Sequence, residues 1–254
     1  MALVEYEVKG RIAYITMNRP EKLNAMNREM IDGLWDGFTN FRDDPEVWLA
    51  IVSGRGRSFS VGHDLAEMSA GGAAVRGHGS TDELYFAEQN IWKPIIATVN
   101  GHCLAQGAGI AMGADIRIAS ETAQFGWPQT KRGISSISGP VILGQRIPLP
   151  RAMELLFTGE FMKADEALAL GLVNHVVPES ELISRTEEIA AKILENAPLA
   201  VRAMKEATMR GLHLSLPDRL NLAGMVFEQV RGSADAQEGL DAFKEKRAPN
   251  WIAK

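Results

Sequence analysis

Hydrophobic and polar residues alternate strictly at the start of the chain and then change to a helical spacing. The alternation runs through residues 4–9 and 11–17, which meet at Gly10, and this pattern predicts a β-hairpin. Beyond it, Asn27 precedes a stretch in which apolar side chains recur at helical spacing up to Phe41. Asparagine is a favoured N-cap, so we expect a helix that begins directly after Asn27.

Short apolar runs in the next part of the chain are separated by stretches with helical spacing. Strands that alternate with helices are typical of the crossover connections of an α/β fold. The Gly- and Ala-rich residues 70–80 are where order is least secure. We expect strands over residues 47–52, 95–99 and 116–119, and helices over residues 107–113 and over 82–92, the latter stopping before Pro94.

The pattern becomes mostly helical from Gly139 onward. No low-complexity linker or internal repeat divides the chain, so we expect one α/β core over residues 1–195 and a helical oligomerisation region over 196–254. The second region carries apolar residues such as Leu220 and Phe227, more than a small extension can bury by itself, which predicts self-association. The expected helices cover residues 151–157, 164–170, 179–195, 199–210, 216–230 and 234–246, with one further strand over 171–177.

Composition narrows the class of protein. A net charge of −5 with scattered basic residues argues against a nucleic-acid-binding surface. Cys103 is the only cysteine, which excludes an internal disulfide framework and fits a reducing compartment. The N-terminus lacks the pattern of a secretory signal, and no run reaches the roughly 18 apolar residues that span a bilayer. We therefore expect a cytoplasmic protein that binds neither nucleic acid nor membrane.

Two turns rich in small residues follow two of the expected strands. The first is Ser60-Val61-Gly62-His63-Asp64, and the second runs from Asn100 to Gly109. Small residues let the backbone approach a substrate carbonyl, and backbone N–H groups then stabilise the negative charge that develops on its oxygen. The sequence therefore predicts an oxyanion hole.

Other chemistries fit the same residues less well. The turn at Gly107 and Gly109 begins like a dinucleotide-binding motif, but Met112 stands where that motif needs its third glycine. Residues 56–60 lack the last glycine of a nucleophile elbow, and Cys103 is interpreted as a small core residue. The sequence has neither His-Glu-x-x-His nor paired Cys-x-x-Cys, so no metal site is expected.

Six segments keep a common order and spacing that runs nearly from end to end. They are residues 17–26, 59–65, 93–115, 125–128, 158–159 with 164–176, and 243–247. Each is a weak signal alone, but together they resemble the crotonase (enoyl-CoA hydratase/isomerase) superfamily. The resemblance implies an α/β crotonase-like spiral of ββα turns with a helical C-terminal trimerisation region, and hence a homotrimer or homohexamer.

The resemblance also implies a substrate and a site. Acyl-CoA thioesters bind without a further cofactor, and two backbone N–H groups hold the thioester oxygen. Carried over by position, these donors are His63 and Gln106, the latter standing where the family usually has a glycine. The positions that resemble the coenzyme A groove are Lys22, Leu23, Ala25, Asp64, Leu65 and Ala66, with Lys22 a partner for a phosphate.

The expected acids are replaced in this chain. The two glutamates of family hydratases fall at Gly109 and Gln129, and the aspartate of related isomerases and dehalogenases falls at about Ile137. None of these residues carries a proton, although losing one general acid–base group costs about 10²–10⁴-fold in rate. The remaining candidate proton carriers are Glu88, Glu67, His102 and His63, together with Asp82 and Glu83.

Further residues are expected to contact the acyl group. Tyr85 and Trp92 are expected to shape an acyl pocket, and Ser135, Ser136 and Ser138 to bond an oxygenated acyl group. The leading hypothesis is addition, elimination or double-bond migration beside a thioester. A catalytically silent acyl-CoA binder or partner subunit, and a hydrolase of a carbon–carbon or thioester bond, remain as alternatives.

Overall fold

A six-stranded sheet forms the centre of the chain. The computed structural model describes residues 2–69 and 81–254, without the side chains of residues 68, 69, 81–83 and 86. The expectation for residues 70–80 therefore lies outside the described residues. The strands are β1 (Val4–Lys9), β2 (Ile12–Met17), β3 (Leu49–Gly54), β5 (Ile95–Val99), β7 (Ile116–Ser120) and β10 (His175–Val177), paired in that order. β1 and β2 form the predicted hairpin, and all other pairs are parallel.

Two strand boundaries differ from the sequence expectation. β3 begins at Leu49, because the N–H groups of Trp48 and Leu49 both donate to Arg11 O and leave residue 48 outside the ladder. The strand expected over 171–177 is confined to β10, because residues 171–174 turn to bond Arg117. The Asn174 side chain accepts from Arg117 N, and Leu172 O accepts from Arg117 Nε.

A second, four-stranded sheet was not predicted. Its strands are β4 (Ser58–Ser60), β6 (His102–Leu104), β8 (Gln124–Gly126) and β9 (Phe161–Lys163), in that order, with β9 antiparallel to β8. Each has only three residues, too few to display a period of two. This sheet carries both small-residue turns, since β4 leads into the first and β6 into the second.

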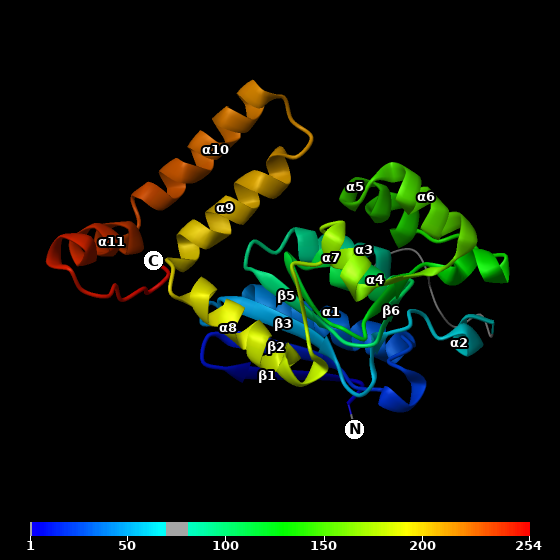
Figure 1. The fold of residues 1–254 in the computed structure, drawn as a ribbon. Helices are drawn as coiled ribbons and strands as arrows, with labels where there is room; N and C mark the ends of the chain where they lie inside the picture. Colours follow the sequence, from blue (N-terminus) through cyan, green and yellow to red (C-terminus); the bar gives the residue numbers. More distant parts are fainter. Residues whose placement is uncertain (1, 70–80) are drawn as a thin grey trace.

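Helices cover both faces of the large sheet. α1 (Arg28–Asp43) begins as predicted after Asn27, whose side chain accepts from Met30 N at 3.1 Å. Along β3, Ala50 and Val52 pack into the core that includes α1, whereas Leu49 and Ile51 face α8 (Leu182–Leu194). Figure 1 shows α8 lying across the sheet.

The remaining helices lie mostly where helical spacing predicted them. The helix expected over 82–92 is α3 (Thr81–Gln89). It ends earlier than expected because Asn90 and Ile91 close a tight turn before Pro94. The other elements are η1 (Pro20–Lys22), α2 (Leu65–Ser69), α3 (Thr81–Gln89), α4 (Gln106–Gly113), η2 (Pro128–Arg132), the π-helical turn η3 (Gly139–Leu143), α5 (Gly144–Arg146), α6 (Leu149–Thr158), α7 (Ala164–Ala169) and η4 (Glu179–Glu181).

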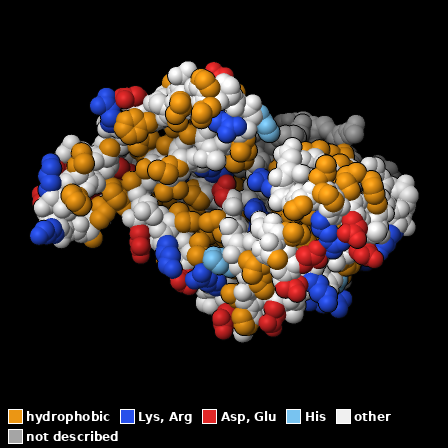
Figure 2. All heavy atoms as spheres, turned by 45° about the horizontal axis from the view of Figure 1, so that its top comes forward, with side chains coloured by type: hydrophobic (Ala, Val, Ile, Leu, Met, Phe, Trp, Pro, Cys, Tyr) orange, Lys and Arg blue, Asp and Glu red, His pale blue; other side chains and the backbone are white. Residues whose placement is uncertain are grey.

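Three C-terminal helices extend away from the two sheets (Figure 1). They are α9 (Pro198–Gly211), α10 (Leu216–Arg231) and α11 (Ala234–Glu245), of which α9 and α10 pack against each other. Leu220, Phe227 and Phe243 are 67%, 60% and 84% exposed. Figure 2 shows hydrophobic side chains gathered over these helices.

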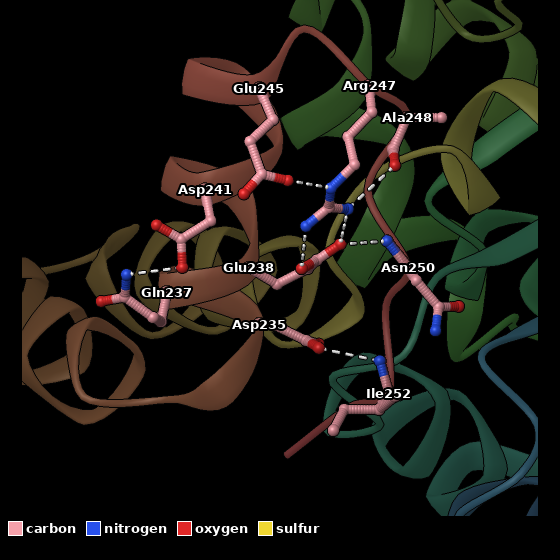
Figure 3. Close-up of polar contacts among 9 residues, drawn as sticks. All are labelled: Asp235, Gln237, Glu238, Asp241, Glu245, Arg247, Ala248, Asn250 and Ile252. Carbon is pink, nitrogen blue, oxygen red and sulfur yellow. Dashed lines mark hydrogen bonds and ion pairs between the residues drawn. The ribbon is translucent and has the colours of Figure 1, made fainter.

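The last residues fold back along α11 (Figure 3). Arg247 pairs with both Glu238 and Glu245, and Glu238 also accepts from Asn250 N at 2.6 Å. Buried Asp235 accepts from the N–H groups of residues 252 and 253. The tail is thereby fixed against the start of α11. No helix in the described ranges is both long and apolar enough to cross a membrane.

Candidate active site

The two small-residue turns lie against each other at the carboxyl ends of β4 and β6. Gly62 has φ +87°, and a Cβ built on it would lie 3.1 Å from Gln106 N. A Cβ on Gly107 would lie 2.5 Å from Ser60 O. The contact at Gly107 is closer than an L side chain allows, and the contact at Gly62 is tighter than most, so these glycines let the backbone at His63 and Gln106 come together.

The second turn enters helix α4 through a strained residue. Ala105 has φ 52° and ψ −120°, a combination that costs an L residue free energy and persists only where its surroundings enforce it. Its N–H donates to Gly126 O at 2.8 Å. α4 starts at the next residue, Gln106, so the positive end of the helix dipole lies at this turn.

A cavity of about 900 Å³ opens over the two turns. Both expected oxyanion donors, His63 and Gln106, line it, as do Gln129, Ile137 and His102. The structure thus brings residues from four separate parts of the chain to one place. The six expected groove positions, Lys22, Leu23, Ala25, Asp64, Leu65 and Ala66, line the same cavity.

One rim of the cavity is fixed by buried polar contacts. Asp64 Oδ2 accepts from Arg19 Nη1 at 2.7 Å, and this pairing lowers the pKa of the Asp64 carboxyl. The fully buried Asn24, at φ 55°, donates to the carbonyls of Ser58 and Phe59 and accepts from Arg19 N. Residues 22–25 are therefore held against the 60–64 turn.

Positive charge gathers at the mouth of the cavity. Lys22, Lys131 and Arg132 line it and are exposed, while Asp64 is the one acidic residue among its described lining and is already paired with Arg19. Three cations suit a ligand with several phosphates. Only Lys22 was predicted. Lys131 and Arg132 were not predicted, although two adjacent basic residues shortly after Trp127 could have indicated them.

The two histidines of the cavity differ in environment. Burial lowers the pKa of the His63 imidazole below its usual 6.5, so the ring is neutral at pH 7. The His102 ring stands edge-on to Phe161, with centroids 6.1 Å apart. Phe161 comes from β9, which sequence periodicity did not detect.

A family model described as "Enoyl-CoA hydratase/isomerase" matches residues 7–254. The chain belongs to the enoyl-CoA hydratase/isomerase family. It is 38% identical over 245 residues to the short-chain-enoyl-CoA hydratase of Clostridium acetobutylicum, covering 95% of this chain and 94% of that protein. It is 35% identical over 249 residues to the (E)-benzylidenesuccinyl-CoA hydratase of Thauera aromatica, covering 97% of each.

Solved structures of the family share the fold along the whole chain. The crystal structure of enoyl-CoA hydratase from Mycobacterium tuberculosis H37Rv superposes with a TM-score of 0.92 at 35% identity and covers 100% of both chains. The two mixed sheets and the C-terminal helices are thus the crotonase fold that the sequence resemblance implied.

At Gly109, the first position where family hydratases are expected to hold a glutamate, a side chain would press against two neighbours. A Cβ on Gly109 would lie 3.0 Å from Gln106 Nε2 and 3.2 Å from Ser138 Cβ. The Gln106 side chain, 4% exposed, packs beside Gly109. The residues at 106 and 109 are therefore sterically coupled: a larger residue at 109 would displace the Gln106 side chain.

The other two expected acid positions face the cavity. Gln129 and Ile137 both line it. The Gln129 carboxamide oxygen is buried and accepts no hydrogen bond within the described structure. A buried acceptor without a donor is costly, so this atom is available to a bound hydroxyl or water.

Two of the carboxylates considered as proton carriers lie elsewhere. Glu67 accepts from Arg28 N at 3.0 Å and thereby caps α1. Glu88 is fully buried against Gly113 at the far end of α4, about 10 Å from Gln106 along the helix. Neither is among the described residues that line the cavity. The side chains of Asp82 and Glu83 lie outside the described residues.

Burial dominates the chemistry of Glu88. It raises the pKa of this carboxyl well above its usual 4.5, against the opposing charge of Lys205. Neither carboxyl oxygen has a hydrogen-bond partner in the described structure. Burial therefore favours the neutral form of the Glu88 carboxyl.

Of the other residues expected to contact the acyl group, some line the cavity and others do not. Ser135 and Ser136 line the cavity, whereas Ser138 is buried and accepts from Trp127 Nε1 at 3.1 Å. Tyr85 and Trp92 line a different cavity, beside α9. Tyr85 lies on α3, which packs on α4, and Trp92 follows the end of this helix.

Proposed function

We propose that the chain binds an acyl-CoA thioester and stabilises its enolate with the backbone N–H groups of His63 and Gln106. The observation that carries this proposal is the meeting of the two turns beneath a cavity with a cationic mouth. Fixed donors in a low-dielectric site stabilise developing charge without reorganisation, and the positive end of α4 adds to the effect. Lys22, Lys131 and Arg132 would hold the phosphates of coenzyme A.

Proton transfer then falls to an unusual group. With Gly109, Gln129 and Ile137 at the expected acid positions, the imidazole of His102 is the best remaining carrier on the cavity wall. The Gln129 carboxamide would orient a hydroxyl or water without moving its proton. The proposed reaction class is addition, elimination or double-bond migration. Hydration of a short enoyl-CoA is expected to be slow, because no carboxylate stands at the expected acid positions.

A panel of enoyl-CoA and 3-hydroxyacyl-CoA thioesters tests the proposal. Turnover is followed by the absorbance of the enoyl thioester, and binding by calorimetry. We expect His102→Gln to lower kcat about 10²–10⁴-fold while leaving binding within threefold. The matched control is His175→Gln, on β10 outside the described cavity lining. An unchanged kcat would exclude His102 as the carrier.

Binding without turnover would favour the second candidate, a catalytically silent acyl-CoA-binding member or partner subunit. The missing carboxylates favour this candidate specifically. Release of free coenzyme A, measured with a thiol reagent, would reveal the third candidate, a hydrolase. No binding of any acyl-CoA would overturn the proposal as a whole.

We further propose that residues 196–254 serve oligomerisation and residues 1–195 the reaction, in a homotrimer or homohexamer. The support is the set of exposed apolar side chains on α10 and α11, including Leu220, Phe227 and Phe243. Large apolar faces of this kind are typically covered by a second copy of the chain.

A further inference from the structure

A second cavity of about 280 Å³ adjoins the first. It lies between the turn after Trp127 and the helices α5 and α6. Three side chains, Gln129, Ser135 and Ser136, line both cavities and thus form the partition between them. None of the sequence motifs pointed to this space.

The walls of the second cavity are apolar. Trp127 presents only its ring, because its Nε1 already donates to Ser138 Oγ. Ala152 and Leu156 from α6 form another wall, and no charged side chain is among the described residues lining it. For scale, an engineered apolar cavity of about 150 Å³ binds benzene. The space suits a ring or a branched or extended hydrocarbon chain.

Gly144 helps to keep this cavity open. Gly144 lines it, and a Cβ built there would meet only Leu149 Cδ1, at 3.4 Å. Gly144 has φ −65°, which every L residue adopts, so its small size is not required by the backbone. Its lack of a side chain therefore leaves this part of the cavity empty.

The three side chains of the partition are polar, whereas the walls of the second cavity behind them are mostly apolar. The buried oxygen of Gln129 lacks a donor, and Ser135 and Ser136 flank it. An acyl chain whose thioester oxygen sits at His63 and Gln106 would pass Gln129 before reaching the apolar walls. This order matches an acyl group with a hydroxyl close to the thioester and a hydrocarbon end.

We propose that the second cavity receives the apolar end of the acyl group, so that the chain selects acyl-CoAs with a ring or with more than four acyl carbons. This inference rests on the proposed acyl-CoA function. The partition residues admit the chain, and Gly144 provides the room that its end occupies.

Affinity for inert saturated thioesters tests the inference. Calorimetry compares butyryl-CoA with octanoyl-CoA and 3-phenylpropanoyl-CoA on the full chain. We expect the two longer ligands to bind at least tenfold more tightly, since each buried methylene contributes several-fold. Equal affinities would overturn the inference and leave the acyl-CoA function standing, whereas failure of butyryl-CoA itself to bind would overturn both.

A variant that fills the cavity sharpens the test. Gly144→Leu is expected to abolish the tenfold gain while leaving butyryl-CoA binding unchanged. Gly144→Ala is the matched control, because it makes the same change at the backbone but adds only one methyl group, and it should retain most of the gain. A full gain in Gly144→Leu, with an unchanged melting temperature, would overturn the inference.

Photolabelling uses the unmodified protein, so its result does not depend on whether a variant folds. An octanoyl-CoA with a diazirine at its terminal carbon should label residues on α6, such as Met153 and Phe157, which line the second cavity. Excess butyryl-CoA should prevent this labelling by competing for the thioester site. Labelling confined to residues 65–90 would place the acyl end elsewhere and overturn the inference.

Discussion

At the scale of single residues, the site is defined by paired substitutions. By the sequence resemblance, Gln106 is expected at a position where the family has a glycine, and Gly109 where family hydratases have an acid. A Cβ on Gly109 would lie 3.0 Å from Gln106 Nε2, so a larger residue at 109 requires the Gln106 side chain to move or to be replaced. The N–H of residue 106 is a backbone group, so a donor at this position survives the exchange of its side chain.

This coupling predicts how hydration can be restored. We expect the triple variant Gln106→Gly, Gly109→Glu, Gln129→Glu to hydrate crotonyl-CoA about 10²-fold or more faster than the unmodified chain. Gly109→Glu alone should give no gain and should lower the melting temperature, because its side chain would displace the buried Gln106 carboxamide. Enoyl absorbance measures the rate, with Gln106→Gly as the control. Equal activity of the single and triple variants would contradict the coupling.

Glu88 gives a second prediction at this scale. Its pKa is raised in the folded chain, so above the unfolded value near 4.5 the unfolded state binds fewer protons and is favoured. Glu88→Gln removes this cost. The stability advantage of the variant should therefore grow from pH 5 to pH 8, by at most about 1.4 kcal/mol per pH unit. Turnover should not change.

Urea unfolding at several pH values measures the effect on stability. Glu29→Gln, at an exposed position on α1, is the control and should show no such trend. An advantage that is constant with pH, or that shrinks as pH rises, would mean that Glu88 is ionised in the folded chain.

At the scale of elements, the site depends on loops that the small sheet and buried side chains hold together. The 22–25 segment is irregular beyond η1, yet it forms a wall of the cavity. Asn24 fixes it to β4 through the carbonyls of Ser58 and Phe59. Its positive φ suits asparagine better than most other residues.

Removing the Asn24 side chain should therefore loosen the segment. We expect Asn24→Ala to destabilise the fold by about 3 kcal/mol or more, because several buried backbone groups lose their partner at about 1–3 kcal/mol each. Acyl-CoA affinity should fall in parallel. Urea unfolding and calorimetry measure the two effects, with exposed Asn221→Ala as the control. A loss below 1 kcal/mol would show that water replaces the lost contacts.

At the scale of the whole molecule, the C-terminal helices present an apolar face without a cover. Leu216, Leu220 and Phe227 recur at helical spacing along one side of α10 and are 60–69% exposed. α10 packs against α9, and ion pairs and backbone contacts hold the tail against α11, so the apolar face belongs to ordered helices (Figure 3). A preformed apolar face favours association of copies, since little ordering is needed.

Charge on this face should dissociate the oligomer. We expect Leu220→Asp with Phe227→Asp to shift the chain from trimer or hexamer toward monomer in sedimentation experiments, because a carboxylate buried without a partner costs several kcal/mol. Asn221→Asp adds a charge on a neighbouring side of α10 and should leave the oligomer intact. A monomeric unmodified chain would contradict the oligomer proposal.

The sequence by itself determined the hairpin, the parallel core strands, the order of helices and the two small-residue turns, because periodicity and capping are local properties. Its motifs also indicated the family and six of the residues that line the cavity. Tertiary structure alone decided the three-residue strands, since their pairing comes from distant segments. It also decided that Glu67 and Glu88 lie away from the cavity, that Gln106 packs beside Gly109, and that a second cavity opens behind Gln129. These depend on which side chains meet in space, and no local pattern encodes such distances.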